Sequence, residues 1–196
     1  GFSRRIAETI INSTNSDGIV IGIYGAWGEG KTSVQNFIEH ELKQDDNILV
    51  VKLNPWRYSD EETLIKNFLK KIAEALGKEL DSNKEKFGGL VAKYGGIGGV
   101  IGIDFSNIGK NLSEIDLEIL KDRVDEFLKE STKKLVIFVD DIDRLDKNEI
   151  YSLLRLVKLT GDFRNTTYIL SFDEDMVASA IGERFGSGDE KSGRNF

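Results

Sequence analysis

The chain has 196 residues, no cysteine, and 34 acidic residues against 27 basic ones, which gives a net charge of −7 at pH 7. This length suits a single domain with a substantial core, and the acidic balance gives no general reason to expect nucleic acid as a partner. The lack of cysteine excludes a disulfide framework and fits a reducing cytosol.

Apolar residues recur along the chain in two alternating patterns. Apolar residues have the spacing of a helix face in six segments, which we predict to be helices: 3–14, a segment that begins near 31, 59–77, a segment that begins near 113, 147–160, and a segment that includes 176 and 177. Short, continuously apolar runs at 19–24, 48–53, 135–139 and 166–172 are typical of strands buried on both faces of a parallel sheet. Strands that alternate with helices predict an α/β fold, a three-layer α/β/α domain with a mainly parallel central sheet.

Polar residues mark where several of these helices begin. Ser59 and Glu62 form a capping-box pair for the third helix, which we expect to end at Gly77. Asp146 and Asp173 are suitable N-caps for the last two helices. The second helix is expected to turn an apolar stripe inward, made of Val34, Phe37, Ile38 and Leu42.

The segment between the first strand and the second helix has the pattern G-x-x-x-x-G-K-T. A phosphate-binding loop requires this placement, because its backbone N–H groups and the N-terminus of the next helix together surround an anion. Lys31 would then reach the β- and γ-phosphates, and the Thr32 hydroxyl would ligate Mg²⁺. The alternative is a glycine-rich turn with a chance lysine, which the strand-and-helix context disfavours. The predicted nucleotide-binding residues are Gly25, Ala26, Trp27, Gly28, Glu29, Gly30, Lys31, Thr32 and Ser33.

Two adjacent carboxylates, Asp140 and Asp141, end the third apolar run. Ligands of open α/β sheets bind at the carboxyl ends of the strands, so we expect Asp140 to hold Mg²⁺ and Asp141 to activate the water that attacks the γ-phosphate. The alternative is an acidic turn before the next helix. The sequence has no N-K-x-D and no D-x-x-G motif, so it lacks the usual parts of a GTPase.

Four stretches together resemble the KAP group of P-loop NTPases: "IGIYGAWGEGKTS", "LNPWRY", "VIFVDDIDRL" and "YILSFDEDMV", in that order. The resemblance implies an ATPase of the additional-strand type with five strands in its central sheet, using ATP and Mg²⁺. Members act at the inner face of membranes, as scaffolds in animals and often in phage exclusion or plasmid-borne systems in bacteria. By match, Lys31, Thr32, Asp140 and Asp141 keep the roles given above. Ser171 or Asp173 would be the polar sensor of the γ-phosphate, with Asp173 equally explained as a helix cap.

Other polar residues near these motifs have simpler explanations. Trp56 and Arg57 are expected to pack and pair against the sheet edge rather than touch ATP. Arg144 is expected to hold the acidic loop in place. Three arginines are candidates for an arginine finger, and the sequence does not choose among Arg155, Arg164 and Arg184.

We interpret residues 1–196 as one KAP-type domain, truncated at its C-terminus, with a glycine-rich insertion around 86–110 and a helical segment at 111–130. The insertion contains overlapping G-x-x-x-G pairs in "GGLVAKYGGIGGVIGIDF", at 88–105. Its apolar part at 90–103 covers 14 residues and includes a lysine, whereas a membrane span needs about 20. A glycine-rich loop, an interfacial or shortened membrane element, and a partner-binding segment all remain open.

Two functions fit these motifs. The first is an enzyme that hydrolyses ATP with Mg²⁺, and the second is a slow-turnover switch or scaffold that binds ATP at the membrane. We expect ATP and a protein partner or self-assembly, a membrane contact through 88–105, no nucleic acid, and a cytoplasmic location, peripheral to or anchored at the inner membrane. Turnover by this chain alone is expected to be slow, since such sites are commonly completed by an arginine from elsewhere.

Overall fold

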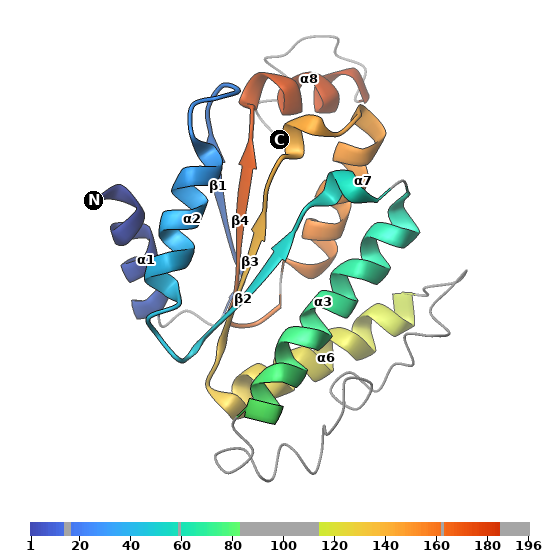
Figure 1. Ribbon diagram of the computed structural model, residues 1–196. Coiled ribbons are helices and arrows are strands. Elements are labelled where there is room, and N and C mark those ends of the chain that lie inside the picture. The colour runs from blue at the N-terminus through green and yellow to red at the C-terminus, as the bar shows by residue number, and fades with distance from the viewer. Residues whose placement is uncertain (14–16, 59, 83–113, 162, 185–196) are drawn as a thin grey trace.

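The computed structural model describes residues 1–13, 17–58, 60–82, 114–161 and 163–184. Its centre is a sheet of four parallel strands, β1 (Ile19–Tyr24), β2 (Ile48–Leu53), β3 (Lys134–Val139) and β4 (Thr166–Phe172), in the order β1-β4-β3-β2. Because all four strands run the same way, their carboxyl ends meet at one edge, at the top of Figure 1. We call it the carboxyl edge, and the opposite one the amino edge.

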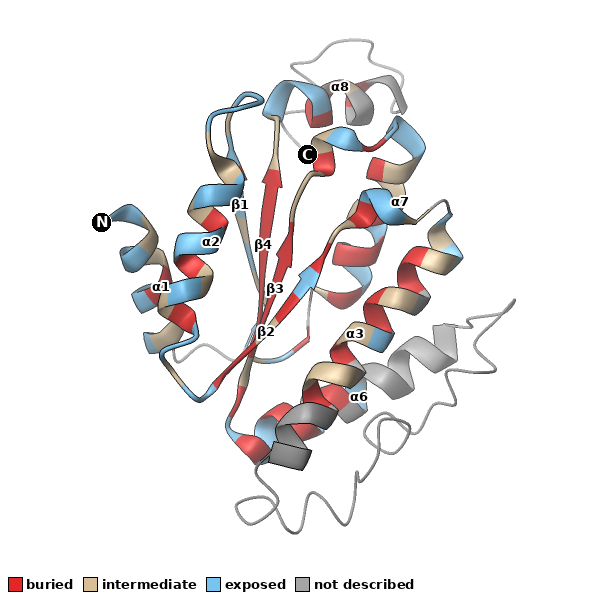
Figure 2. Cartoon of the chain, viewed as in Figure 1, coloured by how far each residue is buried: buried red, intermediate tan, exposed pale blue. Residues whose placement is uncertain are grey.

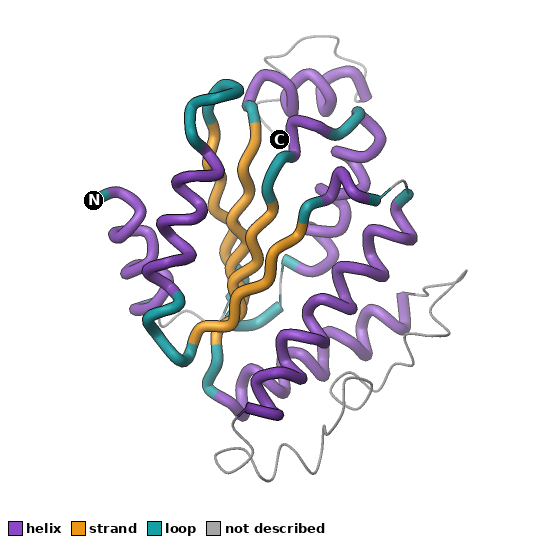
Figure 3. The backbone as a smooth tube through the Cα atoms, in the orientation of Figure 1, coloured by secondary structure: helices purple, strands orange, loops and turns teal. Residues whose placement is uncertain are grey.

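Helices cover both faces of the sheet, which confirms the three-layer α/β/α prediction (Figures 1 and 3). One layer holds α1 (Phe2–Asn12) and α2 (Lys31–Leu42), and the other holds α3 (Glu61–Ser82), α6 (Glu114–Ser131) and α7 (Lys147–Thr160). Two short 3-10 helices, η1 (Pro55–Arg57) and η2 (Ile142–Arg144), follow β2 and β3, and α8 (Glu174–Arg184) follows β4.

The strand order places β4 between β1 and β3. The strand that leads into the glycine-rich loop and the strand that precedes the two aspartates are therefore separated by one additional strand, as the resemblance to the KAP group implied. The fifth strand that the resemblance implies is not found among the described residues.

Each face of the sheet has its own hydrophobic core. Successive side chains of a strand point to opposite faces, so alternate residues belong to different cores. Leu135, Ile137 and Val139 of β3 face α3, α6 and α7, whereas Val136 and Phe138 face α1 and α2. All five are at most 1% exposed. Figure 2 shows similar burial along β3 and β4, and along β2 apart from an exposed stretch at Lys52.

The prediction that the first strand is buried on both faces was wrong for β1. Val20 is 51% exposed and Tyr24 is 65% exposed, and only Ile23 of this strand is buried. The exposed residues alternate along the strand, so they share the face opposite the cluster with α1 and α2 that Ile21 and Ile23 join. A place at the end of the sheet is not sufficient as a reason, because β2, at the other end, is mostly buried.

Two details of the helices also need correction. In α2, Phe37 is 64% exposed and Gln35 is buried in its place, because the inward face of this helix carries Gln35, Ile38 and Leu42. In α3, the helix continues past Gly77 to Ser82, and its first turn is capped by Asp60, whose carboxylate accepts from the Thr63 N–H at 2.7 Å. Ser59 lies outside the described residues. The expected apolar positions from Leu64 to Leu76 are buried as predicted.

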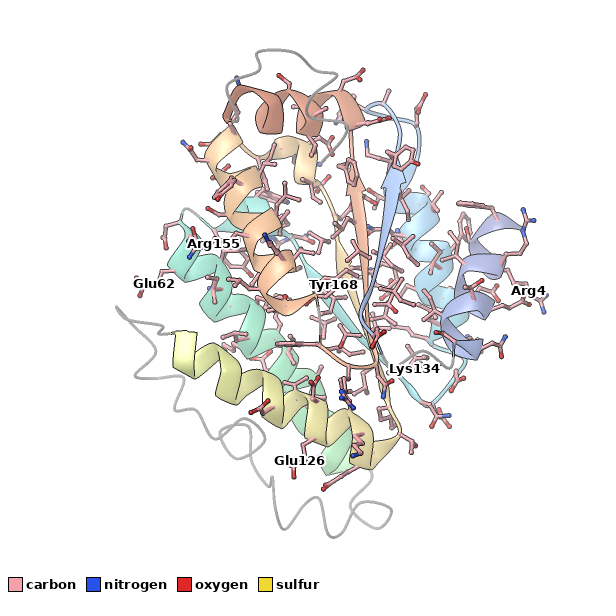
Figure 4. All side chains as sticks on the ribbon, turned by 180° about the vertical axis from the view of Figure 1, so that it is seen from behind. Arg4, Glu62, Glu126, Lys134, Arg155 and Tyr168 are labelled. Atoms are coloured by element: carbon pink, nitrogen blue, oxygen red, sulfur yellow. The ribbon has the colours of Figure 1, made fainter. Side chains whose placement is uncertain are left out.

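The amino edge is held by a lysine. Lys134, at the start of β3, donates from Nζ to the carbonyls of Ile10, Ile11 and Ser13 at 3.0, 2.6 and 2.7 Å (Figure 4). These are carbonyl groups at the end of α1, which lack partners within the helix. The lysine therefore fixes α1 to the sheet.

The glycine-rich insertion predicted around 86–110 lies outside the described residues, and the helical segment at 111–130 corresponds in its described part to α6. Among the helices that the structure describes, none is both long and apolar enough to cross a bilayer.

Candidate functional site

The loop from Gly25 to Gly30 joins the carboxyl end of β1 to the first residue of α2 (Figure 1). Gly28 and Gly30 both have φ of 87°, in the left-handed region, where a side chain would cost about 1–2 kcal/mol. Gly30 precedes the helix without a side-chain cap, and the Val34 N–H donates to its carbonyl at 3.0 Å. The N–H groups of the first turn of α2 are thus left for an anion at its N-terminus.

Glu29 closes this loop on itself. Its Oε2 accepts from the Ala26 N–H at 2.9 Å, and a Cβ built on Gly25 would lie 2.7 Å from the same oxygen. Glycine at position 25 therefore leaves room for the Glu29 carboxylate. Trp27 lies at the tip of the loop with 81% of its surface exposed, and Thr32 and Ser33 are also exposed.

Lys31 is folded back over the loop that precedes it. Its Nζ donates to the carbonyls of Gly25 and Ala26, at 2.9 and 3.2 Å. Its side chain is only 10% exposed. An ammonium group has three N–H donors, so two hold the loop and one remains for a further acceptor.

The two predicted carboxylates follow β3 at the carboxyl edge, but they lie in different settings. Asp140 Oδ1 accepts from the N–H of Asp141 at 2.9 Å. Asp141 has φ of 59°, and its Oδ1 is paired with Arg144 Nε at 3.1 Å. The prediction that Arg144 holds the acidic loop is confirmed by this contact.

The loop after β2 meets the acidic loop through an aromatic ring. Trp56 has the guanidinium groups of Arg57 and Arg144 over its ring, with Cζ at 5.4 and 5.7 Å from the centroid. Such contacts are favourable because the ring face is electron-rich. Trp56 and Arg57 are exposed, and they are connected to Asp141 through Arg144; their expected packing against the sheet edge stays a prediction.

Ser171 is fully buried near the end of β4, and its hydroxyl oxygen accepts from Gln35 Nε2 at 2.6 Å. Gln35 also donates to the carbonyl of Val139, at 3.1 Å. This amide ties the first turns of α2 to the ends of β3 and β4. Asp173 caps α8, as its Oδ1 accepts from the Asp175 N–H at 3.0 Å, so the simpler explanation for this residue is confirmed.

The arginine-finger candidates lie in different places. Arg155 on α7 is paired with Glu61 of α3 at 2.9 Å. Arg164 precedes β4, at the amino edge, and its backbone N–H donates to Asp125 at 2.7 Å. The side chain of Arg184 lies outside the described residues.

A cavity of about 340 Å³ opens beside the acidic loop, between the first turns of α3 and α7. Its acidic residues already have structural partners: Asp60 and Asp146 cap the two helices, and Glu61 pairs with Arg155. Burial raises the pKa of Tyr58 in its wall, against the opposing charge of Arg57. No residue of the glycine-rich loop lines this cavity.

Two functional candidates were missed by sequence reasoning, Asp143 and Gln35. Asp143 in η2 is 7% exposed, and its Oδ2 lies 3.8 Å from Lys31 Nζ. A signal for Gln35 did exist, since it has the helical spacing of Ile38 and Leu42 and is polar within a buried stripe. Asp143 had a weaker signal, as a carboxylate two residues beyond Asp141 and directly after an apolar residue.

Comparison with known proteins gives two results. Residues 1–196 match the family described as "KAP family P-loop domain". The curated "Phage T7 exclusion protein" of Escherichia coli (strain K12) is 25% identical over 215 residues, an alignment that covers 92% of this chain and 28% of that protein. The chain therefore spans less than a third of the length of this relative.

Proposed function

The chain belongs to the KAP family of P-loop domains, which implies nucleotide binding, and from this premise we propose that it binds ATP with Mg²⁺ and hydrolyses it. The observation that carries the proposal is the position of Lys31. Its Nζ is fixed by two loop carbonyls and keeps one donor beside the uncapped N-terminus of α2. This arrangement suits the β- and γ-phosphates of a nucleotide, since a cation and several N–H groups face the same anion.

The residues at the carboxyl edge are suited to Mg²⁺ as well. Mg²⁺ takes oxygen ligands, usually one or two from the protein together with phosphates and water. The Thr32 hydroxyl and the Asp140 carboxylate are the residues that would hold it. When bound, the ion neutralises charge that develops on the phosphate oxygens.

Asp141 is the proposed base, and Ser171 is the proposed γ-phosphate sensor, because Asp173 is used as the N-cap of α8. The water oxygen attacks the γ-phosphorus and its proton passes to the Asp141 carboxylate. The bond from that phosphorus to the bridging oxygen breaks, and ADP leaves with the electron pair. Arg144 now holds Asp141 at 3.1 Å, so this ion pair has to loosen before the carboxylate can accept a proton.

A second candidate function, a slow-turnover ATP switch or scaffold in phage exclusion or defence, is favoured by two observations. The proposed base is occupied by Arg144 in this structure, which suits slow turnover. The curated relative is named as an exclusion protein. For this candidate a cytoplasmic domain that contacts a membrane or a protein partner is the working arrangement.

The deciding experiment measures both binding and product. Calorimetry with Mg-ATP tests binding, and ADP released per chain tests hydrolysis. We expect Asp141→Asn to keep Mg-ATP affinity and to lose at least ~100-fold in turnover, the usual contribution of a positioned base. The matched control is Asp122→Asn on α6, which changes charge equally at an exposed site. Wild-type turnover in Asp141→Asn would assign water activation to another residue, and a single ADP per chain would favour the switch.

A further inference from the structure

Asp143 is more deeply buried than Asp141, the proposed base. Its side chain is 7% exposed, against 27% for that of Asp141. Its Oδ1 is buried and has no hydrogen-bond partner within the described part of the chain. A buried carboxylate oxygen without a donor is costly, and so such atoms mark places where a ligand or water completes the structure.

The other oxygen of this carboxylate faces the phosphate loop. Asp143 Oδ2 lies 3.8 Å from Lys31 Nζ, beyond hydrogen-bond distance and within the range of a strong charge interaction. Both side chains are at least nine-tenths buried, so solvent screens this pair poorly. In this structure Asp143 therefore balances the charge of the lysine that is proposed to bind phosphate.

Arrival of a triphosphate changes this balance. Phosphate oxygens on Lys31 Nζ would bring several negative charges close to the Asp143 carboxylate, and like charges at such a distance repel strongly. A divalent cation removes the repulsion, and water on that cation can donate a hydrogen bond to a carboxylate oxygen that lacks one. Asp141 is differently placed, because Arg144 already neutralises it.

We propose that Asp143 is a positioning residue of the nucleotide site, which pairs with Lys31 without nucleotide and accepts hydrogen bonds from Mg²⁺-bound water when nucleotide is present. It thereby makes triphosphate binding depend on Mg²⁺. This proposal rests on the proposed function, since it requires that the loop bind ATP.

The test is the affinity for ATP measured by calorimetry twice, with Mg²⁺ and with EDTA, in the wild type and in Asp143→Asn. Removal of the charge should raise the metal-free affinity, and the ratio of the two affinities should shrink at least ~10-fold. Asp122→Asn is the matched control and should keep the wild-type ratio. A carboxylate that only stabilises the fold would change both affinities alike and leave the ratio constant.

Asp143→Ser provides a second neutral variant, without a buried amide beside Lys31, and circular dichroism checks the fold of both. An unchanged ratio in either folded variant overturns the proposal, and so does failure of both variants to fold, because the role would then be structural. If the wild type binds no ATP under either condition, the proposed function itself fails. Wild-type binding with an unchanged ratio in Asp143→Asn rejects only the role of Asp143.

Discussion

Lys31 and Lys134 lie at opposite edges of the same sheet, and both donate hydrogen bonds to backbone carbonyl groups. At the amino edge, Lys134 Nζ donates to three carbonyls at the end of α1, which use all of its N–H groups. At the carboxyl edge, Lys31 Nζ donates to two carbonyls and faces the carboxylate of Asp143. The first lysine is saturated by the fold, whereas the second has one N–H group that no backbone carbonyl accepts, the donor that we propose for phosphate.

The comparison shows that the hydrogen-bond partners distinguish the two partly buried lysines. Lys134 uses all its donors within the fold, whereas Lys31, the proposed phosphate ligand, does not. Left-handed backbone does not make the same distinction, because Thr132 and Asn165 at the amino edge have positive φ, as does Asp141 at the carboxyl edge. The informative difference is how many polar groups remain without a partner inside the fold. Three predictions test this contrast.

The largest effect is expected for Lys31→Ala. The loop loses its cation, and we expect ATP affinity to fall at least ~100-fold, which is the loss of one or two strong charged hydrogen bonds. The fold should be kept, because the substitution leaves the hydrophobic clusters on both faces of the sheet intact. Calorimetry with Mg-ATP measures the loss, and circular dichroism checks the fold. Lys134→Met is the control from the other edge and should keep the affinity; undiminished binding in Lys31→Ala would reject the loop as the nucleotide site.

Lys134→Met should show the opposite result, with lower stability and unchanged ATP affinity. The carbonyls of Ile10, Ile11 and Ser13 lose their donor, and we expect the free energy of unfolding to fall by about 1–2 kcal/mol. The loss should be modest because the ammonium group is partly desolvated. Burial lowers the pKa of Lys134 more than the charge of Asp45 raises it, and this cost of burial offsets part of the stabilisation from the hydrogen bonds. Urea unfolding followed by circular dichroism measures it, with Lys129→Met on the exposed side of α6 as control. If Lys134→Met were as stable as Lys129→Met, the structural role assigned to Lys134 would be wrong.

The smallest effect is expected for Glu39→Gln, midway between the edges on α2. Burial raises the pKa of the Glu39 carboxyl, but hydrogen bonds from Lys52 and Lys43 and their charges outweigh it and hold the pKa below its ordinary value of 4.5. Since the folded-state pKa is lowered, the stabilisation is present above pH 4.5 and is lost as the pH falls through the lowered value. Both lysines are largely exposed, so we expect about 0.5 kcal/mol at pH 7. Unfolding of wild type and variant at pH 7 and at about pH 3 should show this difference vanish; a difference that persists in acid would contradict the ionic account.

Much of the fold was predictable because its signals are local. Continuous apolar runs gave β2, β3 and β4, and Asp146 gave the start of α7, where its carboxylate accepts from the Glu149 N–H at 2.9 Å. The prediction for β1 failed because exposure depends on which faces of a strand the helices cover, and an apolar run in the sequence does not contain that information; β2, also at an end of the sheet, is mostly buried. The prediction that Phe37 is buried was wrong for a related reason. The apolar residues of α2 allow more than one inward face, and only packing against the sheet selects the face with Gln35, Ile38 and Leu42.

The sequence by itself determined the loop from Gly25 to Thr32, its strand-and-helix context, and the acidic pair after β3, because each depends on residues close together in the chain. The tertiary structure decided which carboxylate faces Lys31. Gln35 and Val139, 104 positions apart, and Lys31 and Asp143 are brought together only by the strand order β1-β4-β3-β2. Local patterns do not contain that order, because it results from packing both faces of the sheet at once. The sequence therefore identified Asp140, Asp141 and the nearby Arg144, which pairs with Asp141, but the approach of Asp143 to Lys31 depends on the folded chain.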